Sequence, residues 1–319
     1  MQPELIWDGL LDWVSLTAEV FTDPTRRVYW LYLCAAIPFA LYALRRREAR
    51  RRLARSARSL DLRTDILCML VNTGLEASLV APLMLSAPLI AESISGQLAA
   101  LGLELGAPAA RGLGAELAFS LSCVLLTDLA LTLTHRLFHR VPALWAFHSV
   151  HHAAEQLTPL LVYRFHPVET VITGAVLTGV LGITQGLADT CAPGLAATTM
   201  SGLNVFVLAF YLLAYNLRHS PLWIDYPRSL RWLLISPAQH QVHHSSAARH
   251  QGRNYGFMFS FWDRAFGSLY EPAGHEHLEF GLGAEGLRRP WRLWEVYLLP
   301  FQRCYQALTR GPRGAPGSP

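Results

Sequence analysis

The sequence contains no lysine, because all 27 of its basic residues are arginines. A lysine Schiff base or a lysine general base is therefore excluded. Cysteine is also scarce: five residues lie far apart without a CxxC pair, which indicates neither a zinc knuckle nor a redox dithiol. Charged residues make up only 16% of the 319 residues, whereas 52% are apolar and mean hydropathy is positive. This composition is typical of a polytopic membrane protein.

Long apolar runs predict the membrane-spanning segments. A span needs about 17–25 residues, and residues 28–44 come near that length. The second apolar region, residues 64–90, either crosses once or enters and returns as a re-entrant pair. Further spans are expected at residues 114–134, 169–187 and 196–215. The predicted fold is an all-α integral membrane protein with about four to six membrane helices.

The remaining segments are expected to be peripheral. Residues 91–113 read as a loop or an interfacial helix. Residues 290–308 suit an interfacial amphipathic segment with Trp291, Trp294 and Tyr297 at headgroup level, and residues 311–319 are expected to be disordered. We divide the chain into an N-terminal membrane region (1–113), a catalytic region (114–271) and a peripheral C-terminal segment (272–319).

A block of nine arginines, from Arg45 to Arg63, follows the first apolar run. Positive charge beside a membrane helix favours the cytoplasmic side and contact with anionic lipids, and we expect no nucleic-acid partner. If residues 64–90 cross once, every histidine cluster lies on this same side. The predicted location is a multi-pass protein of the bacterial inner membrane or the endoplasmic reticulum, with its site facing the cytoplasm.

Three short windows hold eight of the 13 histidines: HRLFH at 135–139, HSVHH at 148–152 and HQVHH at 240–244. On a helix, His135 and His139 share one face, while each HxxHH triplet can offer ligands to two ions. Many imidazoles without carboxylates suit iron, zinc or copper. About four ligands saturate one zinc, so eight indicate a dinuclear site in a histidine-rich helical cap.

Two further histidines are candidates, and three are not. His219, in NLRHS just after the last predicted span, is the best candidate for a ninth ligand. His166 can be a ligand, a hydrogen-bond donor behind a ligand, or a helix cap before Pro167. The others, expected to be solvated, are His250, His275 and His277.

Asp128 and Arg164 are charged residues in apolar surroundings, where each needs a partner. We interpret Asp128 as the acceptor for the free N–H of His135 or His139, the alternative being a bond to a nearby threonine. Arg164 is expected to pair with Glu155 or Glu169, the alternative being a substrate headgroup.

Residues after the last histidine window are expected to support it. These residues are Asn254–Tyr255–Gly256, for which the alternative is a simple turn, and Trp262–Asp263, for which the alternative is a helix start with Asp263 near the cap.

The order HRLFH, HSVHH, NLRHS, SPAQHQVHH, NYG and WDRAFGSLY resembles the fatty acid hydroxylase superfamily, in particular its sterol desaturase branch. The resemblance covers about residues 114–271. It implies a membrane-bound non-haem di-iron oxygenase that uses O2 and external electrons to hydroxylate or desaturate a lipid C–H bond. The implied iron ligands are His135, His139, His148, His151, His152, His219, His240, His243 and His244.

The resemblance implies a sterol substrate first and a fatty-acyl or alkyl lipid second. The only His-Pro pair is followed by Val168, so the HPGG haem motif of cytochrome b5 fusions is absent and no bound haem is expected. Electrons are then expected from a separate donor, a ferredoxin or a cytochrome b5 with its reductase. The alternatives are a metal transporter or sensor, a bis-histidine haem protein, and a catalytically silent lipid-binding homologue.

Overall fold

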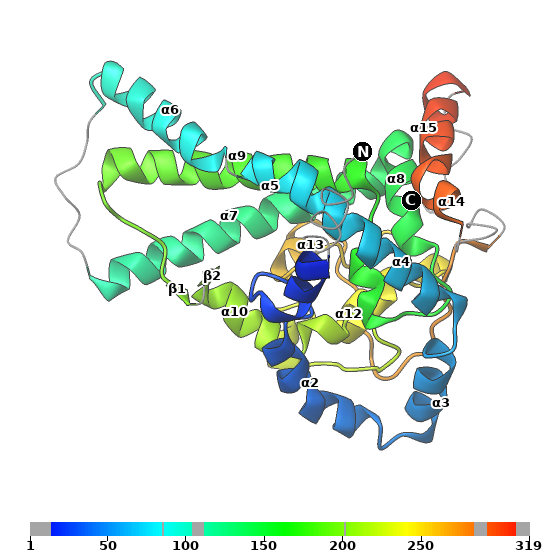
Figure 1. Ribbon diagram of the computed structural model, residues 1–319. Helices are drawn as coiled ribbons and strands as arrows, with labels where there is room; N and C mark the ends of the chain where they lie inside the picture. The colour runs from blue at the N-terminus through cyan, green and yellow to red at the C-terminus, as the bar shows by residue number, and fades with distance from the viewer. Residues whose placement is uncertain (1–13, 85, 104–111, 201, 284–291, 311–319) are drawn as a thin grey trace.

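The computed structural model describes residues 14–84, 86–103, 112–200, 202–283 and 292–310, and these are mostly helical (Figure 1). Three helical runs are long and apolar enough to cross a membrane: Leu60–Ala100, Leu113–Arg140 and Pro167–Cys191. The predicted helical fold class is therefore confirmed. The last residues, 311–319, and Trp291 lie outside the described residues.

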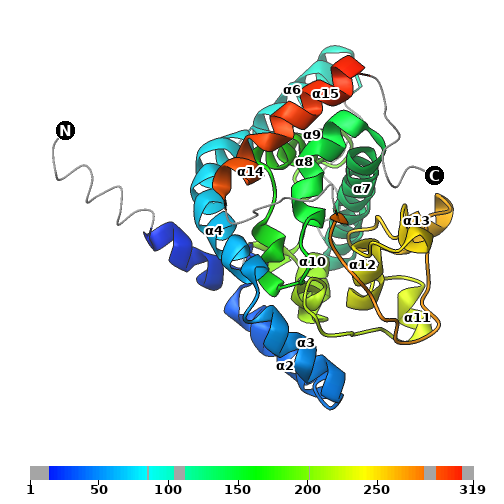
Figure 2. The same cartoon turned by 90° about the vertical axis from the view of Figure 1, so that its right-hand side faces the viewer.

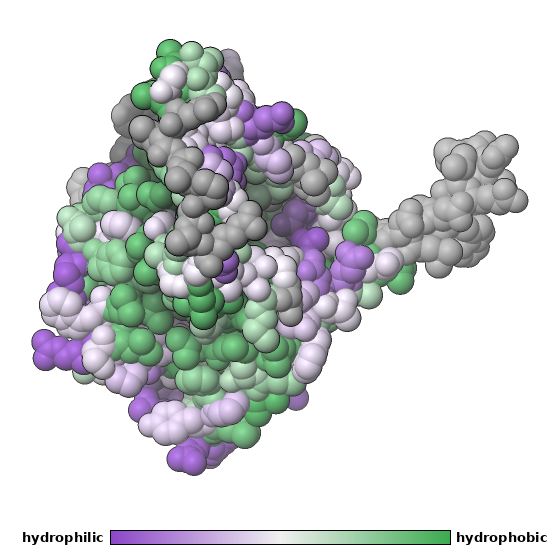
Figure 3. Space-filling model, turned by 90° about the vertical axis from the view of Figure 1, so that its left-hand side faces the viewer, coloured by the Kyte–Doolittle hydropathy of each residue, from purple (hydrophilic) through white to green (hydrophobic). Residues whose placement is uncertain are grey.

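The three apolar runs extend to one side of the molecule and share their opposite end with the shorter helices (Figure 1). The first run contains α4 (Leu60–Leu75), a π-helical turn (Glu76–Val80), α5 (Ala81–Met84) and α6 (Ala87–Ala100). The other two runs are α7 (Leu113–Arg140) and α9 (Pro167–Cys191). At the far end of these helices hydrophobic side chains gather on the surface, with most hydrophilic ones toward the edges (Figure 3).

Helix α7 is longer than a bilayer requires. Its 28 residues span about 42 Å, against about 30 Å for the hydrocarbon layer. The first two histidines, His135 and His139, lie in its last turns. The extra length therefore allows α7 to cross the membrane and still carry both side chains beyond it.

Two expected spans differ from the structure, and a third segment is helical rather than a loop. The segment expected to span at 196–215 instead contains a two-residue hairpin, β1 (Thr199–Met200) with β2 (Leu203–Asn204), and the eight-residue α10 (Val205–Leu212). The expected first span is α2 (Trp30–Ala43), whose 14 residues are fewer than a spanning helix needs. Residues 91–100, expected in a loop or an interfacial helix, continue α6.

Small residues on α9 allow α6 to approach closely. Gly174, Thr178, Gly182, Gly186 and Thr190 recur every four residues and are all buried. A Cβ atom on Gly182 would lie 2.7 Å from Ile90 Cβ, and one on Gly186 would lie 2.7 Å from the Ala91 carbonyl oxygen. Such spacing is the small-xxx-small pattern by which apolar helices gain contact in membranes.

The opposite end of the bundle is a cap of short helices (Figure 2). It includes α8 (Pro142–His152), α11 (Arg228–Arg231), α12 (Pro237–His243), α13 (Phe261–Ala265), α14 (Leu293–Tyr297) and α15 (Leu299–Arg310). Helix α15 packs on α8, where Phe301 meets Phe147 with ring centroids 5.3 Å apart. Tyr297 donates to Asn72 Oδ1 at 3.0 Å, which ties this segment to α4, whereas Trp294 is exposed.

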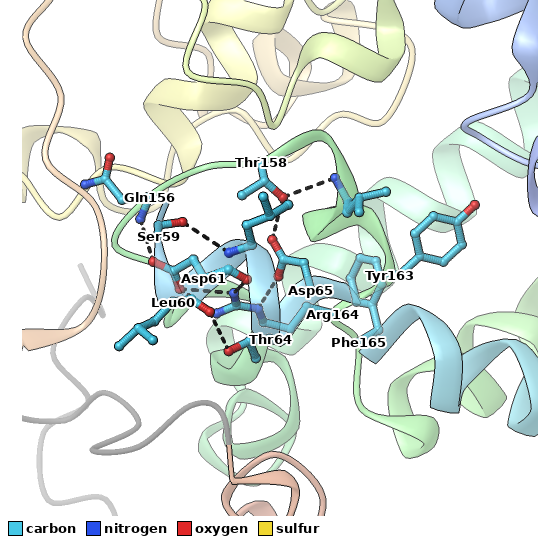
Figure 4. A network of polar contacts seen from close by, with 12 residues as sticks. Ser59, Leu60, Asp61, Thr64, Asp65, Gln156, Thr158, Tyr163, Arg164 and Phe165 are labelled. Carbon is cyan, nitrogen blue, oxygen red and sulfur yellow. Dashed lines mark hydrogen bonds and ion pairs between the residues drawn. The ribbon is translucent and has the colours of Figure 1, made fainter. Parts of the chain in front are cut away.

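A buried ion network joins α4 to the loop that follows α8 (Figure 4). Arg164 is fully buried, and its Nε donates to Asp65 Oδ1 at 2.5 Å while Nη1 donates to Asp61 Oδ1 at 3.0 Å. Thr158 donates to the other Asp65 oxygen at 2.5 Å. The expected pairing of Arg164 with Glu155 or Glu169 is therefore wrong, because α4 supplies both carboxylates.

We predict that Gly182→Ala destabilises the protein by about 1–3 kcal/mol, because the added methyl would overlap Ile90 and the Ala87 carbonyl oxygen. The control is Gly179→Ala, three residues earlier on the same helix, where an added Cβ has nothing within 4 Å. Thermal unfolding in detergent measures both variants. Equal unfolding temperatures for the two variants would contradict the proposed α6–α9 packing.

Candidate metal centre

The structure brings all nine implied histidine ligands together at the inner end of the cap. Their ring nitrogens form two groups, and within each group one nitrogen per residue lies within 4.8 Å of the others. The first group is His135, His139, His148, His152 and His243, and the second is His151, His219, His240 and His244.

Helix geometry explains how the HxxHH windows divide their rings between the groups. In α8, His148 and His152 lie four residues apart and enter the first group, whereas His151 turns toward the second. In the α12 window, one ring, His243, joins the first group, and two rings, His240 and His244, join the second. The groups are adjacent, since the His152 and His244 rings stack 4.3 Å apart.

Both helices begin where their sequences dictate. Helix α8 has Pro142 in its first turn, where the missing N–H costs no hydrogen bond. Helix α12 begins with a capping box: Ser236 accepts from the Gln239 amide at 3.2 Å, and the Gln239 side chain accepts from the Ser236 amide at 2.9 Å. These caps fix the direction in which the following histidines project.

The Nδ1 atoms of three rings are held by acceptors outside the groups. His135 Nδ1 donates to the Tyr255 carbonyl oxygen at 2.9 Å, and His243 Nδ1 donates to the Arg253 carbonyl oxygen at 2.9 Å. His148 Nδ1 lies 2.8 Å from Glu169 Oε1. A carbonyl or carboxylate oxygen only accepts, so each neutral ring carries its hydrogen on Nδ1 and turns a lone pair on Nε2 toward the group.

The segment that supplies two of these acceptors is itself tightly held. Asn254 has a positive φ of 55°, and its side chain donates to the carbonyl oxygens of Gln239 and Tyr270 at 2.9 and 3.0 Å. Asp263 accepts from the amides of Tyr255 and Gly256 at 2.8 and 2.7 Å. The Asn254–Tyr255–Gly256 motif thus fixes the carbonyl that orients His135 in the first window, and Asn254 also binds the chain immediately before His240.

Burial keeps the rings outside the membrane-spanning segments uncharged. It lowers the pKa of His243 to about 3, and it lowers the pKa values of His151, His152, His219, His240 and His244 well below their ordinary value. Neutral imidazole is the form that binds metal ions. These six rings are therefore in their ligating form at neutral pH.

Hydrogen bonds within the protein do not satisfy all the ring nitrogens of the two histidine groups. His135 Nε2 and His148 Nε2 lie 3.2 Å apart, although both Nδ1 atoms hold the hydrogens and two lone pairs therefore face each other. His152 Nε2 lies 3.1 Å from the same His148 atom. Other buried ring nitrogens have no hydrogen-bond partner among the described residues: His139 Nε2, His151 Nδ1, His240 Nδ1 and His243 Nε2. Cations between these lone pairs would resolve the conflict, so the residues fit a metal site.

Two candidates outside the histidine groups take other roles. Asp128 accepts from the amides of Met258 and Phe259 at 2.8 and 3.1 Å, so the predicted bond to His135 or His139 is wrong. His166 caps α9 by accepting from the Val168 amide at 3.1 Å and lies in neither group, which is the capping alternative. His250, expected to be solvated, is fully buried beside Glu276, whereas His275 and His277 are exposed.

Sequence reasoning missed the role of Glu169. It lies in the first turn of α9, is buried, and holds His148, while its Oε2 has no partner among the described residues. Its signal was present in the sequence, because an acid at the start of an apolar run needs a nearby donor. The sequence did not show that this donor is His148, because the two residues are 21 positions apart in the chain.

A cavity of about 480 Å³ adjoins both groups. His135, His148, His151 and His240 line it, together with apolar side chains from the helices, among them Leu75, Met84, Leu131 and Leu177. An apolar molecule in this cavity can therefore lie against the ring nitrogens.

We predict that His139→Ala lowers bound metal, whereas His250→Ala retains it. His250 is fully buried and His139 is partly buried, but only His139 belongs to a histidine group. Elemental analysis of purified protein measures the metal per chain. Equal metal content in both variants would remove His139 from the proposed ligand set.

Glu169→Ala is expected to weaken metal affinity by about 10–100-fold, the usual effect of losing a carboxylate behind a histidine ligand. Glu169→Gln should lose less, because the amide oxygen still accepts from His148 Nδ1. Competition with a metal chelator measures both affinities. Unchanged affinity in the alanine variant would contradict this role.

Comparison with known proteins agrees with the geometry. Residues 120–268 match the family model for fatty acid hydroxylase. The chain is 24% identical over 162 residues to ornithine lipid hydroxylase OlsE of Rhizobium tropici, a match covering 50% of this chain and 44% of that protein. It is 24% identical over 201 residues to alkylglycerol monooxygenase of Xenopus tropicalis, covering 58% of this chain and 40% of that protein.

A third relative is the fatty acid hydroxylase vlmA of a Lecanicillium species, 30% identical over 151 residues, with 42% of this chain and 37% of that protein covered. The matches thus span less than half the length of these relatives. No solved structure gives a significant match. The family model, the relatives and the grouped histidines confirm the resemblance to the fatty acid hydroxylase superfamily that the sequence showed.

Proposed function

We propose that this protein is a membrane-bound, iron-dependent oxygenase that hydroxylates a lipid. The observation that carries the proposal is the pair of all-histidine groups beside an apolar cavity. Two irons, one in each group, are the proposed cofactor, since nitrogen donors suit iron and five plus four histidines exceed what one ion takes. The named activities of the relatives, hydroxylase and monooxygenase, support the same reaction class.

The overall change is RH + O2 + 2 electrons + 2 protons to ROH + H2O. When bound, the metal supplies the activation of O2 and the cleavage of the C–H bond. The protein's own part is different: the Nδ1 contacts orient the rings, and the apolar cavity wall excludes water and holds the lipid against the ring nitrogens. We propose a separate protein, a ferredoxin or a cytochrome b5 with its reductase, as electron donor.

The proposed substrate is a lipid with an acyl or alkyl chain. The relatives are named for an ornithine lipid, an alkylglycerol and a fatty acid, which favours this class over the sterol expected first from sequence. The cavity agrees, because α4, α5, α7 and α9 all contribute apolar side chains to it. All four helices lie in runs long enough to cross a membrane, so a chain can enter from the bilayer.

We further propose that the cap faces the cytoplasm. Helix α3 (Arg47–Ser56) carries much of the arginine block and is bound to the cap, where Ser56 donates to the Leu157 carbonyl oxygen at 2.8 Å. The histidine groups and this basic helix therefore share one side of the bundle, and positive charge favours the cytoplasmic side, beside anionic lipids.

The decisive experiment uses the iron-loaded full chain in lipid nanodiscs with a ferredoxin, its reductase and ¹⁸O2. We predict that one ¹⁸O atom enters the lipid, as measured by mass spectrometry, and that His243→Ala abolishes this incorporation. The exposed His277 gives the control, and His277→Ala should retain it. Loss of two hydrogens without ¹⁸O would indicate desaturation. Retained iron and lipid with no oxidation at all would contradict the oxygenase and favour the silent homologue.

A further inference from the structure

The cavity carries a second chemical feature that the oxygenase site does not use. Besides the ring nitrogens, it is lined by three arginines, Arg26, Arg27 and Arg218. Arg26 is neutralised by Glu76, whose carboxylate lies 2.8 Å from its Nη1. The other two guanidinium groups form no ion pair and no hydrogen bond with the described residues, although Arg218 is only 6% exposed.

Aromatic rings, not carboxylates, hold these two guanidinium groups. Arg27 Cζ lies 5.0 Å and Arg218 Cζ lies 4.9 Å from the centre of the Phe257 ring. Arg218 also lies 4.3 Å from the Tyr215 ring centre. Cation–π stacking fixes a guanidinium by its face and leaves the N–H groups at its edge available to a ligand.

The available donors are buried and unsatisfied. Arg27 Nη1 and Arg218 Nε have no hydrogen-bond partner among the described residues, and the same is true of the hydroxyl groups of Tyr163 and Tyr215. Tyr163 lines the cavity with the arginines. Arg27 and Arg218 are like charges held near each other, and neither forms an ion pair with a described carboxylate. An oxyanion placed between them would relieve the repulsion and satisfy the donors.

We propose that Arg27 and Arg218 bind the oxyanion of an acidic lipid headgroup, whose chain lies along the apolar wall toward the histidine groups. The apolar lining distinguishes this ligand from a free anion: Leu75, Leu131 and Leu177 come from helices in the membrane-crossing runs and continue the same cavity. The proposal rests on the proposed function for the use made of the ligand, but the binding itself can be measured without turnover.

The test compares two amphiphiles with the same chain, 1-oleoyl-lysophosphatidic acid and the uncharged 1-oleoylglycerol, and uses inorganic phosphate as the third probe. Iron-loaded full chain in a non-ionic detergent is titrated calorimetrically under nitrogen. We expect the phosphate-bearing lipid to bind about tenfold or more tightly than 1-oleoylglycerol, as charge-assisted hydrogen bonds predict. We also expect it to bind more tightly than free phosphate.

Variants locate the site. Arg27→Gln and Arg218→Gln should each reduce the ratio of the two lipid affinities toward one, and Arg27→Lys should reduce it only in part. Arg228→Gln removes an equal charge from an exposed residue of α11, outside both the cavity and the arginine block, and should leave the ratio unchanged. Because the ratio is taken within one variant, a smaller folded fraction affects both lipids equally, and unfolding temperature and iron content check each preparation.

Three results would overturn the proposal: equal affinity of the wild-type protein for the two lipids, an unchanged ratio in both glutamine variants, or phosphate binding that depends on the arginines without preference for the acidic lipid. The last result would assign the arginines to a free anion. If the protein oxidises lipids without preferring a charged headgroup, the proposed anion site is contradicted and the proposed function stands. If acidic-lipid binding depends on the arginines but no lipid is oxidised, the anion site stands and the proposed function is contradicted.

Discussion

The convergence of nine imidazoles, seven of them buried, is the constraint on which the rest of the cap depends. A ring that offers Nε2 to the centre must place its Nδ1 hydrogen on an acceptor. The carbonyl oxygens of Arg253 and Tyr255 and the carboxylate of Glu169 provide such acceptors. The side chains of Asn254 and Asp263 then hold the segment that carries these carbonyls. Much of the irregular chain after α12 is explained by the hydrogen bonds of histidine.

Two different forces assemble the two ends of the molecule. In the apolar runs, close approach of α6 to Gly182 and Gly186 provides contact where burial from water contributes little. In the cap, charge and hydrogen bonds dominate, as in the network of Arg164 with Asp61 and Asp65 (Figure 4). Helix α7 belongs to both ends. Its length beyond a bilayer thickness is what brings membrane helix and histidine site into one element.

The sequence predicted whatever depends on local spacing. The histidine windows, the cap of α12 and the helical class follow from residues a few positions apart, and the family resemblance was carried by those windows. Partners distant in the chain were not predictable: Arg164 takes its carboxylates from about 100 residues earlier, and Asp128 binds amides 130 residues later. His250 was misjudged for the same reason, since a polar segment gave no sign that folding would bury its ring. Hydropathy also did not predict the short length of α2 or the hairpin before α10, because it does not show where a helix ends.

Charge balance connects the two ends of the cavity. The histidine groups contain no carboxylate ligand, so cations held there would keep most of their charge, with Glu169 the nearest acid along the lining. Arg27 and Arg218 add two charges that no described carboxylate pairs. In surroundings of low dielectric constant this excess of positive charge opposes a cationic ligand and favours an anionic one. The same electrostatics that the proposed metal centre imposes on the cavity therefore selects the class of lipid that the arginines are placed to bind.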